Sequence, residues 1–263
     1  MKKIIKSIKK CNKSASVYFL NRIDSTNAFA REKARKGETE ATVVIAKKQT
    51  AGRGRLGRSF ISPKGGVYMS VVLRPKILPQ DATIITAAAA VAVCRAIEAV
   101  SDKKCEIKWV NDIYIEGKKV CGILTEGEFA GKKSFEFVVL GVGINLFAPR
   151  GGFPKELTFA GSIFKRKFRK KKIKEKIICK FLNEFFYFYE NLQEKEFIKE
   201  YQSRSILTGK EISYKKEDKT HTGRVVGIDE NAQLLVKEGE STIALSTGEV
   251  QIVAAEGLFE RKL

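Results

Sequence analysis

Closely spaced turns in the middle of the chain limit the folds that this sequence can adopt. Four stretches rich in β-branched and apolar residues are typical of strands: Cys105–Val110, Ile113–Ile115, Val120–Phe129 and Ser134–Leu146. Only a few residues separate each stretch from the next, among them the turn Glu116-Gly117-Lys118. Such short connections join antiparallel neighbours, because parallel strands need a crossover of about a dozen residues or more. The sequence therefore predicts an α+β fold with a mixed, mainly antiparallel sheet.

Helices and two more strands are expected before this region. Asp24-Ser25-Thr26-Asn27 offers N-cap residues, and the pattern after it predicts a helix that stops at Gly37. Asp81–Val100 is alanine-rich and apolar on almost all sides, which indicates a buried helix opened by Asp81. Further strands are expected at Thr42–Lys48 and Gly66–Leu73. No stretch approaches the roughly 20 apolar residues of a membrane span, so no membrane association is expected.

The pattern changes in the last part of the chain. A helix with apolar residues at fourfold spacing is expected from Ile173, and a short one at Glu194–Ser203. From about Ser205 onward, short strands separated by glycines predict a small β-barrel. We therefore expect two domains, residues 1–204 and 205–263.

Three glycines and three arginines alternate within Gly52–Arg58. Glycine lets a backbone approach a ligand closely, and arginine offers a fork of donors for carboxylate or phosphate oxygens. The segment therefore predicts a mobile anion-binding loop, with solvated arginines on a surface loop as the alternative. Its G-x-G-x-x-G spacing matches a dinucleotide fingerprint, but Ser59–Gly65 lacks the helical pattern that such a site requires. A Walker loop is excluded, because no G-x-x-x-x-G-K-[ST] occurs.

Four polar residues interrupt otherwise apolar strand segments: Asn111, Asp112, Lys119 and Asn145. Buried polar groups need partners, so such residues either pair internally or face a ligand. Because several segments carry them, we expect a shared pocket.

The composition bears on partners rather than on the fold. The formal charge of +20 indicates an acidic partner or a lysine-rich surface. Lys165–Lys176 carries nine basic residues and one acidic residue, which raises the alternative of a nucleic-acid-binding protein. The run has one aromatic residue, Phe168, and no recognised binding motif, so a solvated basic surface is favoured over a nucleic-acid partner.

The cysteines and the single histidine argue against several kinds of site. Five cysteines without a C-x-x-C pair disfavour a disulfide framework or a zinc site and favour a reducing compartment. With no signal-peptide core near the N-terminus, we expect a cytoplasmic protein. Because His221 is the only histidine, a Ser-His-Asp triad or a multi-histidine metal site is not expected.

Five short motifs together resemble those of biotin–protein ligases and occur in the order found in that family. They are Asp24–Asn27, Gln49–Arg58, Lys108–Asp112, Lys119–Leu124 and Gly141–Asn145. The resemblance spans about residues 17 to 255 and implies a class II synthetase-like catalytic domain followed by an SH3-like β-barrel. Repressor members of the family add an N-terminal helix-turn-helix domain, and with only about 16 residues before the core we expect a ligase without repressor activity.

Two positions depart from the family pattern. Val110 stands where a proline is usual, which we expect to loosen that turn without removing a functional group. Phe60 stands where a tryptophan is often found. If this side chain stacks on adenine, phenylalanine keeps the π-face but loses area and the indole donor.

The resemblance implies a reaction and a set of partners. Biotin and ATP would react to give biotinyl-5′-AMP and pyrophosphate, with Mg²⁺ on the phosphates. The biotinyl group would then pass to a lysine of a biotin carboxyl carrier protein. A homodimer is possible in this family. A lipoate or octanoate ligase is the alternative within the same chemistry, although the polar Ser25-Thr26 pair suits a ureido ligand better than an alkyl chain.

The resemblance also implies roles for individual residues. The catalytic candidates are Lys119, Arg53 and Asp112. The biotin-binding candidates are Ser25, Thr26, Asn27, Gln49, Gly52, Arg53, Gly54, Arg55, Lys119 and Gly122. The nucleotide-binding candidates are Arg55, Arg58, Phe60, Asn111, Ile123 and Asn145. No dedicated metal ligands are expected, because magnesium on ATP is held largely by phosphate oxygens and water.

Overall fold

The computed structural model describes residues 2, 4–6, 14–131, 134–165, 172–216, 219–248 and 250–253. Within this part, seven strands form one sheet in the order β1-β2-β3-β7-β6-β5-β4. Their bounds are β1 Val17–Leu20, β2 Val43–Ala46, β3 Val67–Leu73, β4 Glu106–Lys108, β5 Asp112–Ile115, β6 Lys118–Phe129 and β7 Phe135–Ile144. The β1–β2 pair is parallel, and the five other neighbouring pairs are antiparallel. The predicted mixed, mainly antiparallel sheet is confirmed.

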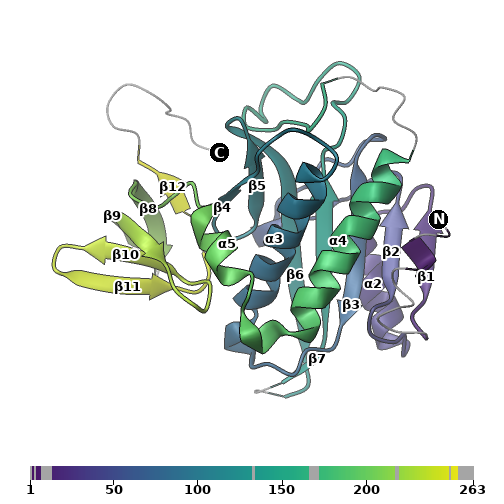
Figure 1. Cartoon of the computed structure of the whole chain (residues 1–263), viewed down its shortest axis with the longest axis horizontal. Coiled ribbons are helices and arrows are strands. Elements are labelled where there is room, and N and C mark those ends of the chain that lie inside the picture. The colour runs from purple at the N-terminus through teal and green to yellow at the C-terminus, as the bar shows by residue number, and fades with distance from the viewer. Residues whose placement is uncertain are drawn as a thin grey trace.

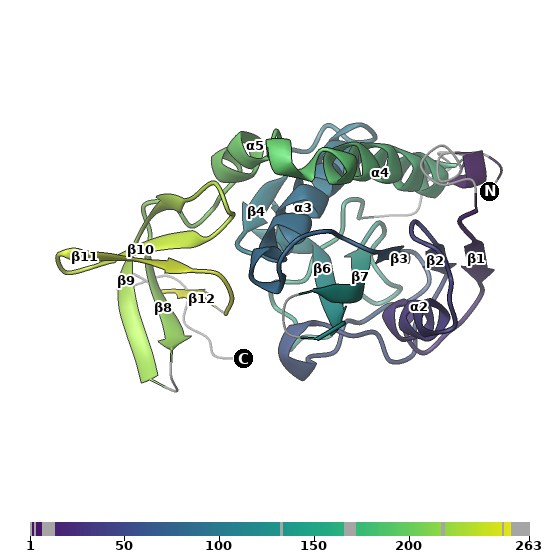
Figure 2. The ribbon, with the colours of Figure 1, turned by 90° about the horizontal axis from the view of Figure 1, so that it is seen from below.

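Helices cover both faces of this sheet (Figures 1 and 2). On one face lies α2, Thr26–Arg35, which packs on β2, β3 and β7. Its N-cap is Ser25, whose hydroxyl accepts a hydrogen bond from the amide of Ala28. The opposite face carries α3, Thr83–Glu98, and α4, Ile173–Glu190, which pack on each other. The sheet therefore lies between one helix and a helix pair.

The α3 helix differs from its predicted form in two ways. It begins at Thr83 after a 3₁₀ turn at Pro79–Asp81, and no side chain caps it, so Asp81 does not open the helix. In length and apolar composition, residues Pro79–Glu98 meet the requirement for crossing a membrane, contrary to the expectation that no stretch would do so. However, 72% of this window is buried inside the protein. The apolar surface of α3 is thus accounted for by packing against the sheet and α4.

A second sheet follows the short helix α5, Ile198–Ser203. Its strand order is β11-β10-β9-β8-β12, and all neighbours are antiparallel. The bounds are β8 Glu211–Lys216, β9 Lys219–Ile228, β10 Leu234–Glu238, β11 Ser241–Leu245 and β12 Val250–Ile252. The pairings among these described strands leave β11 and β12 at the edges, so the closed barrel and the boundary at residue 205 stay predictions. Figure 1 shows this sheet beside the larger one, next to β4 and α5.

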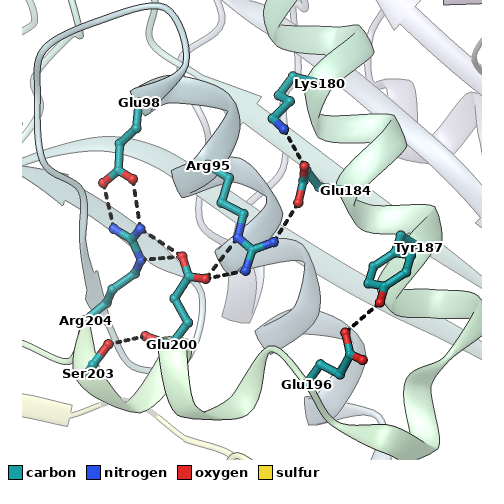
Figure 3. Close-up of polar contacts among 9 residues, drawn as sticks. All are labelled: Arg95, Glu98, Lys180, Glu184, Tyr187, Glu196, Glu200, Ser203 and Arg204. Carbon is teal, nitrogen blue, oxygen red and sulfur yellow. Dashed lines mark hydrogen bonds and ion pairs between the residues drawn. The ribbon is translucent and has the colours of Figure 1, made fainter.

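A network of ion pairs joins α3, α4 and α5 (Figure 3). Arg204, directly after α5, lies 2.7 Å from Glu98 and 2.8 Å from Glu200. Arg95 of α3 lies 2.7 Å from Glu200 and 2.8 Å from Glu184. Each arginine therefore contacts two carboxylates on different elements, which fixes α5 and with it the start of the second sheet.

Candidate active site

The floor of the candidate site is the part of the large sheet where facing residues of β6 and β7 are glycines without side chains. One row of register partners runs across five strands from Tyr68 through Gly143 and Gly122 to Asp112 and Lys108. The Phe60 ring lies on the two glycines. A Cβ built on Gly143 would lie 2.5 Å from Cε1 of Phe60, and one on Gly122 would lie 3.1 Å from Cε2. Glycine is needed at both positions for the ring to lie this close to the backbone.

The same bare surface continues toward α2. A Cβ on Gly141 would lie 2.1 Å from Oδ1 of Asn27, so this glycine makes room for the Asn27 amide. Asn27 Nδ2 donates to Glu126 at 2.7 Å, and Ser70 Oγ lies 2.6 Å from Asn27 Oδ1 and 2.8 Å from Thr26 Oγ1. The start of α2 is therefore fixed against β3 and β6 by side-chain hydrogen bonds, and it packs closely on Gly141 of β7.

Gln49 connects this polar cluster with the glycine–arginine loop. Its Oε1 accepts hydrogen bonds from the amide and the hydroxyl of Thr26, at 2.7 and 2.9 Å, and its Nε2 donates to Ser62 at 2.8 Å. Gly52 is packed against the same group, because a Cβ there would lie 2.7 Å from Ser62 Oγ and 2.4 Å from the Phe60 carbonyl. The base of the loop is thus held by side chains, and residues 48–52 and 59–63 line a cavity of about 340 Å³.

The loop itself forms a narrow hairpin. The amide of Gly54 donates to the Arg58 carbonyl at 2.7 Å, and the amide of Phe60 donates to the Gly52 carbonyl at 2.8 Å. Arg53 and Arg58 are exposed, whereas Arg55 is half-buried. The three arginines therefore occupy different environments although they alternate in sequence.

Arg55 is held by two elements far apart in the chain. Its Nη1 donates to Oδ1 of Asn111 at 3.1 Å, and its Nη2 donates to the carbonyl of Gly248 at 2.9 Å. Asn111 is fixed in turn, because its Nδ2 donates to the Ile123 carbonyl at 2.8 Å. The contact with Gly248 links the loop to the segment between β11 and β12 of the second sheet.

Lys119 and Asp112 form an ion pair next to Gly122. Nζ of Lys119 lies 2.7 Å from Oδ2 of Asp112, and the side chains are 32% and 20% exposed. Within the described residues, Oδ1 of Asp112 is buried without a hydrogen-bond partner. Burial and the charge of Asp112 raise the pKa of the neighbouring Tyr114 to about 12. A cation and an incompletely paired carboxylate thus lie together beside the glycines on which the Phe60 ring lies.

Two family models match this chain. The biotin/lipoate A/B protein ligase family matches residues 19–145, and the biotin protein ligase C-terminal domain matches residues 208–253. The bifunctional ligase/repressor BirA of Bacillus spizizenii is 35% identical over 234 residues, which is 88% of this chain and 72% of the relative. The chain belongs to the biotin protein ligase family.

Other members of the family extend this result. The biotin–[acetyl-CoA-carboxylase] ligase of Paracoccus denitrificans is 38% identical over 136 residues, covering 51% of this chain and 56% of the relative. The solved structure of the biotin protein ligase from Aquifex aeolicus in complex with biotin and ATP is 27% identical, with a TM-score of 0.72. That similarity covers 91% of this chain and 99% of the Aquifex chain. It therefore includes both sheets.

The structure brings most of the candidate residues together around one face of the sheet. Ser25, Thr26, Asn27 and Gln49 lie at the start of α2 and the base of the loop, whereas Asn111, Ile123 and Arg55 form a second group. Asn145 directly follows β7 and is 8% exposed, and its backbone amide donates to the Val120 carbonyl. Val110, which replaces the usual proline, is buried, and its carbonyl accepts a hydrogen bond from the Tyr201 hydroxyl at 2.9 Å. The basic run falls largely on residues 166–171, which lie outside the described residues.

Sequence reasoning missed several members of the polar cluster. Ser70 is fully buried in β3 and lies within hydrogen-bonding distance of Thr26 and Asn27, and Glu126 accepts hydrogen bonds from Asn27 and Arg31. Ser62 joins Gln49 to the loop. The available signal was a serine within the apolar segment Val67–Leu73, the same kind of interruption that identified Asn111 and Asn145.

Proposed function

We propose that this chain activates biotin with ATP to biotinyl-5′-AMP and transfers the biotinyl group to one lysine of a biotin carboxyl carrier protein. Family membership and the activities named for the relatives support the proposal. The observation that carries it is the position of Lys119, whose side chain lies beside Gly122 at the end of the bare floor and pairs with Asp112. This places a fixed cation where two anionic substrates could lie on the sheet.

In the first step, a carboxylate oxygen of biotin forms a bond to the α-phosphorus of ATP. The bond to the bridging oxygen breaks, and pyrophosphate leaves with the electron pair. The main requirements are the alignment of two anions and the stabilisation of charge at phosphorus. Lys119 provides positive charge on the sheet, and Arg53, Arg55 and Arg58 provide it from the loop. A Cβ in place of Gly122 would meet the Phe60 ring at 3.1 Å and Cε of Lys119 at 3.5 Å, so glycine there leaves room beside the cation.

The two polar groups of the site divide between the two substrates. Biotin lies near Ser25, Thr26, Asn27 and Gln49, whose amides and hydroxyls suit the donors and the acceptor of a ureido ring. The nucleotide lies toward Arg55, Arg58, Asn111, Ile123 and Asn145. Phe60, on the floor between the groups, contributes its π-face.

In the second step, the ε-amine of the carrier lysine attacks the acyl carbon of the adenylate. A carbon–nitrogen bond forms, the bond to the phosphate oxygen of AMP breaks, and the amine loses a proton. Asp112 is the carboxylate suited to accept that proton or to orient the amine.

Mg²⁺ would neutralise charge on the phosphates when bound. The described residues contain no group of three His, Cys, Asp or Glu side chains that could hold a metal ion. Magnesium does not require such a group, because it is commonly held by substrate phosphates, waters and one or two carboxylates. Oδ1 of Asp112, buried and without a hydrogen-bond partner, is the oxygen that could reach it.

The test combines the purified chain with ATP, magnesium and either biotin or lipoate, with and without an apo carrier domain. We expect pyrophosphate release with biotin and a biotinyl mass increase on one carrier lysine. The Lys119→Ala variant should lose adenylation by about 10²–10³-fold, because one electrostatic contact at phosphorus is removed. The control is Lys118→Ala, whose exposed side chain donates to the Thr158 carbonyl outside the floor. Activity with lipoate alone, or normal adenylation by the Lys119 variant, would contradict the proposal.

A further inference from the structure

The second sheet contacts the large sheet's loop at a defined point. The segment Ser246–Gly248 follows β11, and the Gly248 carbonyl accepts a hydrogen bond from Arg55 at 2.9 Å. The two residues are 193 positions apart in the chain. Arg55 is the half-buried arginine of the loop, whereas Arg53 and Arg58 are exposed. The contact therefore involves the loop arginine with the most fixed surroundings.

The acceptors of Arg55 are themselves oriented. Asn111 donates from Nδ2 to the Ile123 carbonyl, so its Oδ1 is turned toward the guanidinium. Gly248 has a φ of +122°, a backbone conformation that other residues rarely adopt, so the direction of its carbonyl depends on glycine. Because both acceptors are oriented, the two hydrogen bonds from Arg55 fix the plane of its guanidinium.

Thr83 holds the same segment from the other side. It is the first residue of α3, and its Oγ1 donates to the Ser246 carbonyl at 2.9 Å. The hydrogen bond of the Thr83 side chain runs to Ser246 and not to the loop or the floor. Its hydroxyl instead joins a buried helix of the large domain to the segment that carries the Arg55 acceptor.

We propose that Thr83 is a positioning residue for retention of the adenylate, and that it acts through Ser246–Gly248 on Arg55. The inference rests on the proposed function, in which the loop arginines contact the bound substrates, and it adds that the loop covers the reactive biotinyl-5′-AMP. The second sheet keeps Arg55 over the site, and the Thr83 hydroxyl keeps the second sheet's segment in place. Loss of that hydroxyl should loosen Arg55 and let the loop open more often, so that biotinyl-5′-AMP escapes before a carrier lysine arrives.

The first experiment measures release of biotinyl-5′-AMP from the pre-formed complex. Thr83→Val keeps the side-chain shape and removes the donor, and we expect release to become about three- to tenfold faster, as loss of one hydrogen bond gives. Thr83→Ser keeps the hydroxyl and should behave as the wild type. Gly248→Ala should also speed release, whereas Gly227→Ala, where a Cβ meets nothing within 4 Å, is the control. Unchanged release by a folded Thr83→Val protein would overturn the proposal.

A second measurement separates positioning from a general effect on the fold. In an Arg55→Ala background, Thr83→Val should add nothing to the release rate, because its effect passes through Arg55. If Thr83→Val speeds release by the same factor in the wild type and in the Arg55→Ala variant, the proposal is overturned.

Amide hydrogen exchange tests the loop without any ligand. Thr83→Val should speed exchange at Gly54 and Phe60, whose amides close the loop hairpin. Unchanged exchange would also overturn the inference. A wild-type chain that forms no adenylate would instead remove the proposed function, while the exchange result would still show whether Thr83 holds the loop.

Discussion

The second sheet is attached to the large one at two ends that differ in kind. At the α5 end, Arg204 joins two carboxylates, the buried Tyr201 hydroxyl donates to the Val110 carbonyl, and the Trp109 indole donates to the Ala232 carbonyl. Backbone hydrogen bonds between Ile107 and residues 204 and 206 reinforce this end. At the other end, Ser246–Gly248 is held by single bonds from Thr83 and Arg55.

The difference indicates which end can open. Local opening takes place where few buried contacts must be broken, whereas redundant buried contacts open only at high free energy. The α5 end should therefore act as a fixed attachment, and the Ser246–Gly248 end as a contact that can loosen. The fixed end also positions the motif Lys108–Asp112, because Trp109 and Val110 supply two of its contacts. Stability and retention of the intermediate should thus depend on different ends.

The largest expected effect comes from Arg204. Arg204→Met keeps much of the side-chain packing but leaves Glu98 and Glu200 without their shared partner. We expect the free energy of unfolding to fall by about 2–3 kcal/mol, because charged hydrogen bonds in a partly buried site are lost. Urea unfolding measures this change. The folded variant should release biotinyl-5′-AMP at the wild-type rate, since the Arg55 contacts are intact.

A different result for Arg204 would break the comparison. If Arg204→Met destabilises the protein by less than about 1 kcal/mol, the α5 end is not a firm attachment. If it speeds release as much as Thr83→Val does, the two ends are not independent. Arg35→Met is a suitable control, because Arg35 pairs with Glu128 on the surface and should contribute little.

A smaller effect is expected from the Tyr201 hydroxyl. Tyr201 is fully buried, and Tyr201→Phe would leave the Val110 carbonyl without this donor. An unsatisfied buried acceptor costs about 1–3 kcal/mol, and we expect a loss of about 1–2 kcal/mol in the free energy of unfolding. Tyr187→Phe is the matched control, because Tyr187 is 50% exposed and donates to Glu196 on the surface. Equal effects of the two substitutions would contradict a buried attachment at this end.

The sequence supported the prediction of the sheet and of much of the candidate site for a physical reason. Glycine, asparagine and lysine within apolar strands are conspicuous, and Gly143, Asn111 and Lys119 lie together around the floor. Ser70 was missed because a lone serine in a strand is an ordinary surface residue unless the face it occupies is known. That face became clear only from the register of β3 with β7.

The contacts between the two sheets could not be predicted in the same way. Arg55 meets Gly248, and Thr83 meets Ser246, through backbone carbonyls that every residue possesses. Side-chain type therefore carries no signal for the acceptor, and the pairing depends on how two separately formed sheets are placed. The start of α3 was misjudged for a related reason: Asp81 is a suitable cap by residue type, but the chain there forms a 3₁₀ turn instead.

The smallest expected effect is the pH dependence that Glu98 gives to the α5 end. Burial alone would raise the pKa of Glu98, but hydrogen bonds from Arg204 and the Cys105 amide, together with nearby positive charge, outweigh it and lower the pKa. A carboxylate with a lowered pKa in the folded state stabilises the protein above its unfolded pKa of about 4.3 and loses that contribution as the pH falls through the folded value.

Glu98→Gln should therefore be slightly less stable than the wild type at pH 7 and should lose less stability below about pH 4. Urea midpoints measured across this range test the expectation, with the exposed Glu156→Gln as control. Because Glu98 acts only at the fixed end, the variant should retain biotinyl-5′-AMP as the wild type does at every pH at which it is folded. A retention defect that follows the Glu98 titration would mean that the α5 end also controls the loop, and the separation of the two ends would then have to be given up.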